Sequence, residues 1–233
     1  MLGAHRLRGT WQQMVNAYVA PSRFCRDYFL TAGLPEAKVH VKQNFLARDP
    51  GKRAGRGQYA FFAGRFVTEK GVLETLEIWT RLPHIPLLVA GDGPLFNDAL
   101  AVVERAGARH IKLLGHLDPQ QTLRCMKEAR FLVFPSRWHE PFGMGLIEAA
   151  ACGVPAVASR VGAIPELVQD GRTGLLFDPA DFGELAGRAQ WAWNHAAQMD
   201  EMGTAARRLY EENFTADRGY ESLMNIYEKV INN

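Results

Sequence analysis

Two glutamates separated by seven residues, Glu140 and Glu148, place carboxylates around a turn that leads into a helical pattern. Gly143 and Gly145 stand between them, and glycine permits a ligand to approach the backbone closely. Apolar runs flank this stretch, so strand, loop, helix and strand follow one another. Loops at the carboxyl ends of parallel strands collect ligands, and a helix N-terminus there favours an anion such as phosphate. The carboxylates can accept hydrogen bonds from sugar or ribose hydroxyls.

A second candidate cluster follows the apolar run at 59–63, where Gly64 allows a sharp turn before Arg65 and Lys70. Two cations at one sheet edge can clamp a diphosphate, arginine through its planar fork and lysine as a point charge. Spacing alone leaves a solvated charged loop as an equally good explanation. His139 is a candidate for a polar wall of the same pocket, although a lone histidine is more often structural than catalytic.

Short apolar runs that alternate with helical patterns predict an α/β fold with a doubly wound parallel sheet. We expect strands at 59–63, 87–90, 111–114, 131–134 and 154–158. Helical spacing covers about 71–82, 95–106 and 119–129, and after residue 177 it continues at 181–198, 201–211 and 216–231. These elements must position the two clusters.

The first 57 residues predict one short strand at 17–20, a helix at 23–31 and another strand at 39–41. Such a set is too small to bury a core of its own. We therefore expect the end of a preceding domain, followed by a linker.

The formal charge of +2 is unevenly distributed: residues 1–56 hold ten Lys or Arg and three acids, and residues 57–233 hold seventeen and twenty-two. No aromatic residues interleave with the basic cluster at 52–57, so nucleic-acid binding is not expected. A weak peripheral association with an anionic membrane, or self-association, stays open. No apolar run approaches the roughly 18 residues that span a bilayer, and the start of the sequence lacks a secretory segment. These features predict a cytoplasmic protein.

Other chemistries find little support in the sequence. Cys25, Cys125 and Cys152 are widely spaced, which indicates free thiols rather than disulfides or a zinc site. The turn Gly91-Asp92-Gly93-Pro94 resembles the start of a dinucleotide fingerprint, but phenylalanine stands where the third glycine belongs. A tight turn is the better explanation, and a nicotinamide-dependent oxidoreductase is disfavoured. Walker A, His-Glu-x-x-His and Gly-x-Ser-x-Gly motifs do not occur.

Taken together, the motifs resemble the C-terminal half of a retaining family-4 glycosyltransferase (glycosyl transferases group 1) of GT-B architecture. The matching motifs are Gly64-Arg65, Glu69-Lys70-Gly71, Gly91-Asp92-Gly93-Pro94, Glu140-Pro-Phe-Gly-Met-Gly-Leu-Ile-Glu148, Gly153-Val-Pro155 and Gly171-Arg-Thr-Gly174. In that family this half is a Rossmann-like domain that binds the nucleotide-sugar donor. A similar N-terminal domain binds the acceptor across a cleft.

The resemblance implies a role for each candidate. Arg65 and Lys70 would hold the donor diphosphate and stabilise the leaving nucleotide, Glu140 would hold the sugar, and Glu148 would contact the ribose. The donor-binding set also includes Gly64, His116, Leu117, His139, Phe142, Gly143 and Met144. The donor would be a UDP-, GDP- or ADP-sugar and the acceptor a carbohydrate or lipid-linked hydroxyl, as in polysaccharide biosynthesis. Neither a metal nor a further cofactor is implied.

The resemblance also implies a division of the chain. Residues 1–57 would be the end of the acceptor domain plus a linker, residues 58–213 the nucleotide-sugar-binding domain, and residues 214–233 a helix that crosses back. The rest of the acceptor domain is missing from the sequence. The alternative is therefore a non-catalytic nucleotide-binding module or an inactive fragment.

Overall fold

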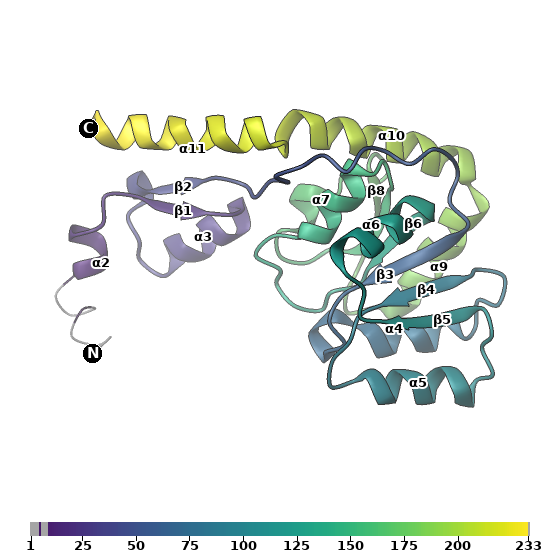
Figure 1. Ribbon diagram of the computed structural model, residues 1–233. Coiled ribbons are helices and arrows are strands. Elements are labelled where there is room, and N and C mark those ends of the chain that lie inside the picture. Colours follow the sequence, from purple (N-terminus) through teal and green to yellow (C-terminus); the bar gives the residue numbers. More distant parts are fainter. Residues whose placement is uncertain (1–4, 6–8, 233) are drawn as a thin grey trace.

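Six parallel strands form one sheet in the order β5-β4-β3-β6-β7-β8 in the computed structural model, which describes residues 5 and 9–232 (Figure 1). The strands are β3 Tyr59–Ala63, β4 Leu87–Ala90, β5 Ile111–Gly115, β6 Ala129–Phe134, β7 Ala156–Ser159 and β8 Gly174–Phe177. Every neighbouring pair is parallel. The predicted doubly wound sheet is thus confirmed. The strand order reverses between β3 and β6, which makes their carboxyl ends a topological switch point.

Helices cover both faces of this sheet (Figure 1). They are α4 Val72–Trp79, α5 Phe96–Arg105, α6 Pro119–Glu128, α7 Met144–Ala151, α8 Ile164–Leu167, α9 Phe182–Asn194 and α10 Ala196–Asn213. One core packs α4, α5 and α9 against the sheet, and a second packs α6, α7, α8 and α10 against the opposite face. Because both faces are covered, β7 and β8 are buried along their whole length.

Three features of this domain differ from the sequence prediction, one of which is the short helix α8, which was not predicted. Strand β8 was not predicted, because a four-residue apolar run carries no periodicity that distinguishes a strand. The helix break expected at 198–201 lies at His195 instead. Met199 and Met202, in the first two turns of α10, are buried in the core beside α9.

A second, smaller unit precedes the six-stranded domain. It comprises α2 Thr10–Gln13, β1 Tyr18–Ala20, α3 Arg23–Thr31, η1 Glu36–Lys38 and β2 Val39–Val41. Strands β1 and β2 pair in parallel as a separate sheet, so the predicted strand, helix and strand are confirmed. We call residues 10–41 the N-terminal unit.

The last helix, α11 Ala216–Ile231, continues from α10 and runs over the N-terminal unit (Figure 1). A groove between α11 and β2 is lined by residues of both, and Ile226 is buried there. An added Cβ at Gly219 would lie 2.2 Å from the Phe45 ring, so the helix also packs closely on the segment after β2. No described helix is both long and apolar enough to cross a membrane.

The turn after β4 fixes the loop that carries Arg65. Gly91 has φ 144°, and an added Cβ would lie 1.9 Å from the carbonyl oxygen of Gly64. The Phe66 N–H donates to the Asp92 carbonyl at 2.9 Å, and the Leu95 N–H donates to the Phe66 carbonyl at 3.1 Å. The close approach of these two loops therefore requires glycine.

We expect Gly91→Ala to lower the free energy of unfolding by at least about 2 kcal/mol, because alanine is strained at this φ and its methyl group meets backbone. Gly187→Ala is the matched control, since Gly187 is exposed within α9 and its added Cβ would meet no heavy atom within 4 Å. That variant should be unchanged or more stable by up to about 1 kcal/mol. Urea denaturation measures both, and equal stabilities would contradict the packing described.

Candidate functional site

A cleft of about 570 Å³ opens at the carboxyl ends of β3, β4, β5 and β6, where the strand order reverses. The loops after these strands and the first turns of α7 form its walls. Almost all of the predicted site residues line it, namely Gly64, Arg65, Lys70, His116, Leu117, Glu140, Phe142, Gly143, Met144 and Glu148. The structure thus gathers in one cleft residues that are spread over 85 positions of the sequence, 64–148.

His139 is the exception among the predicted residues. It does not belong to the lining of the cleft. Its ring stacks on Phe24 of α3, with 5.7 Å between ring centroids and 7° between ring planes. The expectation of a polar wall at His139 is therefore corrected: the loop turns this side chain towards the N-terminal unit while its neighbour Glu140 faces the cleft.

Glu140 is held by two donors that share one of its oxygens. Lys70 Nζ forms an ion pair with Oε1, and the Ser136 hydroxyl donates to the same atom at 2.7 Å. Only 13% of the Glu140 side chain is exposed. Within the described part of the chain no donor reaches Oε2, so that oxygen is available to a ligand hydroxyl.

Two buried serines support this arrangement. The Ser159 hydroxyl, at the end of β7, donates to the Ser136 carbonyl at 2.6 Å, and Ser136 follows β6. Both side chains are buried, and a buried hydroxyl is costly unless it is hydrogen-bonded. The sequence analysis did not identify either serine as a site residue. The signal that could have found them is a serine at the end of each of two consecutive apolar runs.

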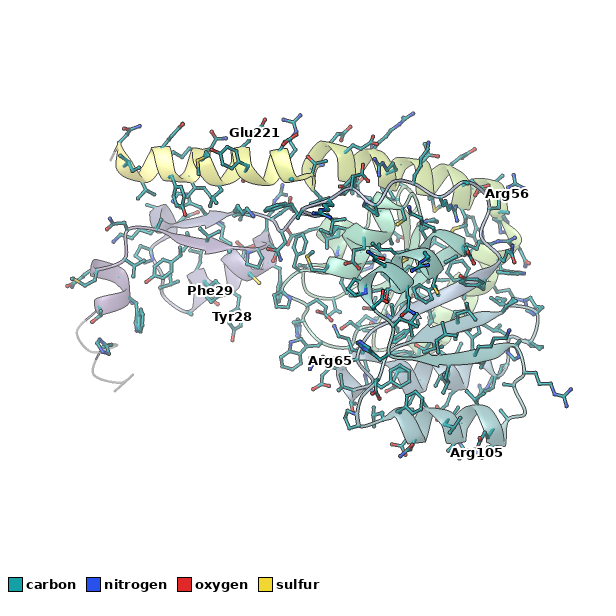
Figure 2. The ribbon with its side chains drawn as sticks, viewed as in Figure 1. Tyr28, Phe29, Arg56, Arg65, Arg105 and Glu221 are labelled. Atoms are coloured by element: carbon teal, nitrogen blue, oxygen red, sulfur yellow. The ribbon has the colours of Figure 1, made fainter. Side chains whose placement is uncertain are left out.

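Arg65 supplies a positive charge to the cleft that no described side chain neutralises. It forms no hydrogen bond or ion pair with any residue that the structure describes, whereas Lys70 is paired with Glu140. Figure 2 shows Arg65 at the end of the sheet that bears the cleft and Arg105 on α5, at the rim of the molecule. A guanidinium without a protein partner is well suited to a multiply charged anion.

Helix α7 presents its N-terminus to the same cleft. It begins at Met144, and its N-cap Gly143 provides no side-chain hydrogen bond to the first turn. The Leu146 N–H donates to the Gly143 carbonyl at 3.0 Å, which leaves the Met144 and Gly145 N–H groups available to an anionic ligand, and the helix dipole adds to their effect. Together with Arg65 they form an anion-binding wall on one side of the cleft.

Glu148 lies one turn into α7 and faces the cleft. Burial raises the pKa of its carboxyl above the usual range. No hydrogen-bond donor from the described residues reaches the carboxylate, so a ligand hydroxyl would be its partner. The cleft thus joins an anion-binding wall to two carboxylates that can accept from hydroxyls, a combination suited to a phosphorylated polyhydroxyl compound.

The chain matches the family model of the glycosyl transferases group 1 over residues 45–209. It is 32% identical over 133 residues to the D-rhamnosyltransferase WbpZ of Pseudomonas aeruginosa. The aligned region covers 56% of this chain and 35% of that protein. The chain is also 32% identical over 175 residues to the glycogen synthase of Mycobacterium tuberculosis, over 73% of this chain and 41% of that protein. The chain therefore spans less than half the length of these curated relatives.

A solved structure shows the same fold. The structure of Anabaena Alr3699/HepE in complex with UDP matches with a TM-score of 0.83 and 21% identity, over 94% of this chain and 64% of that one.

We expect Glu148→Gln to stabilise the unliganded protein more at about pH 7 than at about pH 4. Burial raises the pKa of the carboxyl, so the folded protein holds this proton more tightly than the unfolded chain does. Wild-type stability therefore falls as the pH rises from the unfolded pKa to the folded pKa, whereas glutamine does not titrate. Urea denaturation at both pH values measures the difference. An equal effect at both would show that burial does not penalise this carboxylate.

Proposed function

The chain belongs to the glycosyl transferases group 1, and on that premise we propose that its cleft binds a nucleotide-diphosphate sugar for transfer to an acceptor hydroxyl. The observation that carries this proposal is the convergence of Arg65, Lys70, Glu140 and Glu148 on one cleft beside the uncapped start of α7. Cations and backbone N–H groups suit a diphosphate, and carboxylates suit sugar and ribose hydroxyls. The UDP bound in the Anabaena structure supports a nucleotide ligand of this kind.

Each side chain takes a role that follows from its surroundings. Arg65 and the N–H groups at the start of α7 hold the diphosphate. Oε2 of Glu140, which the protein leaves available, accepts from a hydroxyl of the donor sugar. Glu148 accepts from the ribose, and the base lies beside His116 and Leu117 after β5. The nucleotide is of the UDP, GDP or ADP type.

The proposed reaction is transfer with retention of configuration. The bond between the anomeric carbon and the diphosphate oxygen breaks, and the acceptor oxygen bonds to the same face of that carbon. The acceptor proton passes to the departing diphosphate, so no further base is needed. Negative charge grows on the diphosphate in the transition state, and Arg65 and Lys70 stabilise it there more than in the ground state.

We further propose a division of labour along the chain. Residues 58–213 bind the donor, residues 1–57 belong to the acceptor side, and the helix at 214–233 crosses between them. The contact of α11 with the N-terminal unit supports this division. The acceptor is a carbohydrate or a lipid-linked sugar, and its binding involves an acceptor domain of which residues 1–57 form a part.

Calorimetric titration with UDP-, GDP- and ADP-glucose tests the proposal. One nucleotide class should bind, and Arg65→Ala should weaken that binding by roughly 10- to 100-fold, because a charge-assisted contact to the diphosphate is lost. Arg105→Ala, which removes an exposed arginine of α5, should leave it unchanged. Absence of binding by all three classes at millimolar concentration would contradict the proposal. Binding without sugar transfer to any acceptor would favour a non-catalytic nucleotide-binding module.

A further inference from the structure

The contacts between the N-terminal unit and the six-stranded domain gather beside Glu140. The buried Ser22 hydroxyl donates to the carbonyl of Pro141 at 2.7 Å, and Ser22 Oγ accepts from the Cys25 N–H at 3.1 Å as the N-cap of α3. Ser22 therefore caps α3 and contacts the residue next to Glu140, and the Cys25 thiol donates to the same Pro141 carbonyl at 3.4 Å. The stacking of Phe24 on His139 adds a contact on the other side of Glu140.

Glu166, from the six-stranded domain, accepts hydrogen bonds from the first N–H groups of α3. Its Oε2 accepts from the Arg23 N–H at 2.9 Å, and its Oε1 accepts from the Phe24 N–H at 2.8 Å. The first N–H groups of a helix have no partner inside the helix, and a carboxylate also interacts favourably with the positive end of the dipole. A residue of α8 thus serves as a cap for α3, which lies more than 130 positions earlier in the chain.

The turn that precedes Glu166 contacts the backbone of Glu140. The Ala163 N–H, just before α8, donates to the Glu140 carbonyl at 2.9 Å. Gly162 has φ 58°, and an added Cβ would lie 2.6 Å from the Glu140 backbone nitrogen. The loop at 137–142 is therefore enclosed by α3 on one side and by the turn before α8 on the other.

We propose that Ser22 and Glu166 are positioning residues that clasp α3 to the 137–142 loop and thereby fix Glu140 for the donor sugar. The proposal rests on the function proposed above. It makes recognition of the sugar depend on docking of the N-terminal unit. Ser22 and Glu166 do not line the cleft, and Arg65, His116 and Glu148 lie outside the 137–142 loop, so the contacts of these three residues with the nucleotide depend less on the clasp than the sugar contact of Glu140 does.

Hydrogen exchange on the full chain, without nucleotide, tests the clasp itself. In Glu166→Ala the amides of residues 137–140 and 142 should exchange roughly tenfold faster than in the wild type, because a helix cap and its charge-assisted bonds are lost. Glu166→Gln keeps the size and one acceptor and should give a smaller increase in the same amides. Glu36→Gln is the control, since Glu36 is an exposed acid of the same unit whose ion-pair partner is Arg26. Unchanged exchange at 137–142 in both Glu166 variants would overturn the proposal.

Comparison of Ser22→Ala with Ser22→Thr distinguishes the effect of the Ser22 hydroxyl from a general effect on the fold. Threonine keeps a donor for Pro141 and a cap for α3, so its exchange pattern should follow the wild type, whereas alanine should behave like Glu166→Ala. Unchanged exchange at 137–142 in Ser22→Ala would show that the hydroxyl does not hold the loop and would remove Ser22 from the clasp.

Titration with UDP and with UDP-glucose provides the functional readout. Glu166→Ala should lower the affinity for UDP-glucose roughly tenfold more than that for UDP, because only the sugar contact depends on Glu140. Equal losses for the two ligands would mean a general structural effect and would contradict the positioning role. If neither ligand, nor the GDP- and ADP-sugars, binds the wild type, the proposed function fails, while the exchange experiment still decides whether the clasp exists.

Discussion

The ion pair between Lys70 and Glu140 joins the two halves of the sheet across the switch point. Lys70 follows β3 and Glu140 follows β6, and these strands are neighbours although 70 positions separate the two residues. Both side chains are mostly buried, so solvent screens the pair only weakly. Because Lys70 and Ser136 both contact Oε1, Oε2 of Glu140 remains available to a ligand. In the proposed function, Arg65 and the start of α7 provide the anion-binding side of the cleft, and Glu140 and Glu148 provide the hydroxyl-binding side.

Close backbone approach is the second constraint. Gly91 and Gly162 each occupy a position where an added Cβ would meet backbone atoms, of Gly64 in one case and of Glu140 in the other. These glycines let the loops that carry Arg65 and Glu140 pack against the turns behind them. Both hydrophobic cores reach the floor of the cleft, where Phe62 and Val133 of one core and Leu132 and Phe142 of the other line it.

The sequence predicted the gathering of the site because its motif residues stand at the ends of apolar runs, and parallel strands bring such ends to one edge. It could not predict that His139 and Glu140 face opposite ways, since direction within a loop depends on what packs around it. The sequence also could not predict the cap that Glu166 provides to α3, because no sequence pattern links the start of a helix to a carboxylate far away in the chain. Ser136 and Ser159 escaped notice since serine is common and only their burial makes them informative.

The proposed function depends on where an anion binds to the chain. A crystal structure of the chain soaked with UDP measures this directly. We expect the diphosphate to lie within hydrogen-bonding distance of the Arg65 guanidinium and of the backbone N–H groups at the start of α7, with the ribose at Glu148. UDP bound elsewhere on the molecule, or a diphosphate in the cleft that contacts neither Arg65 nor the start of α7, would contradict the account.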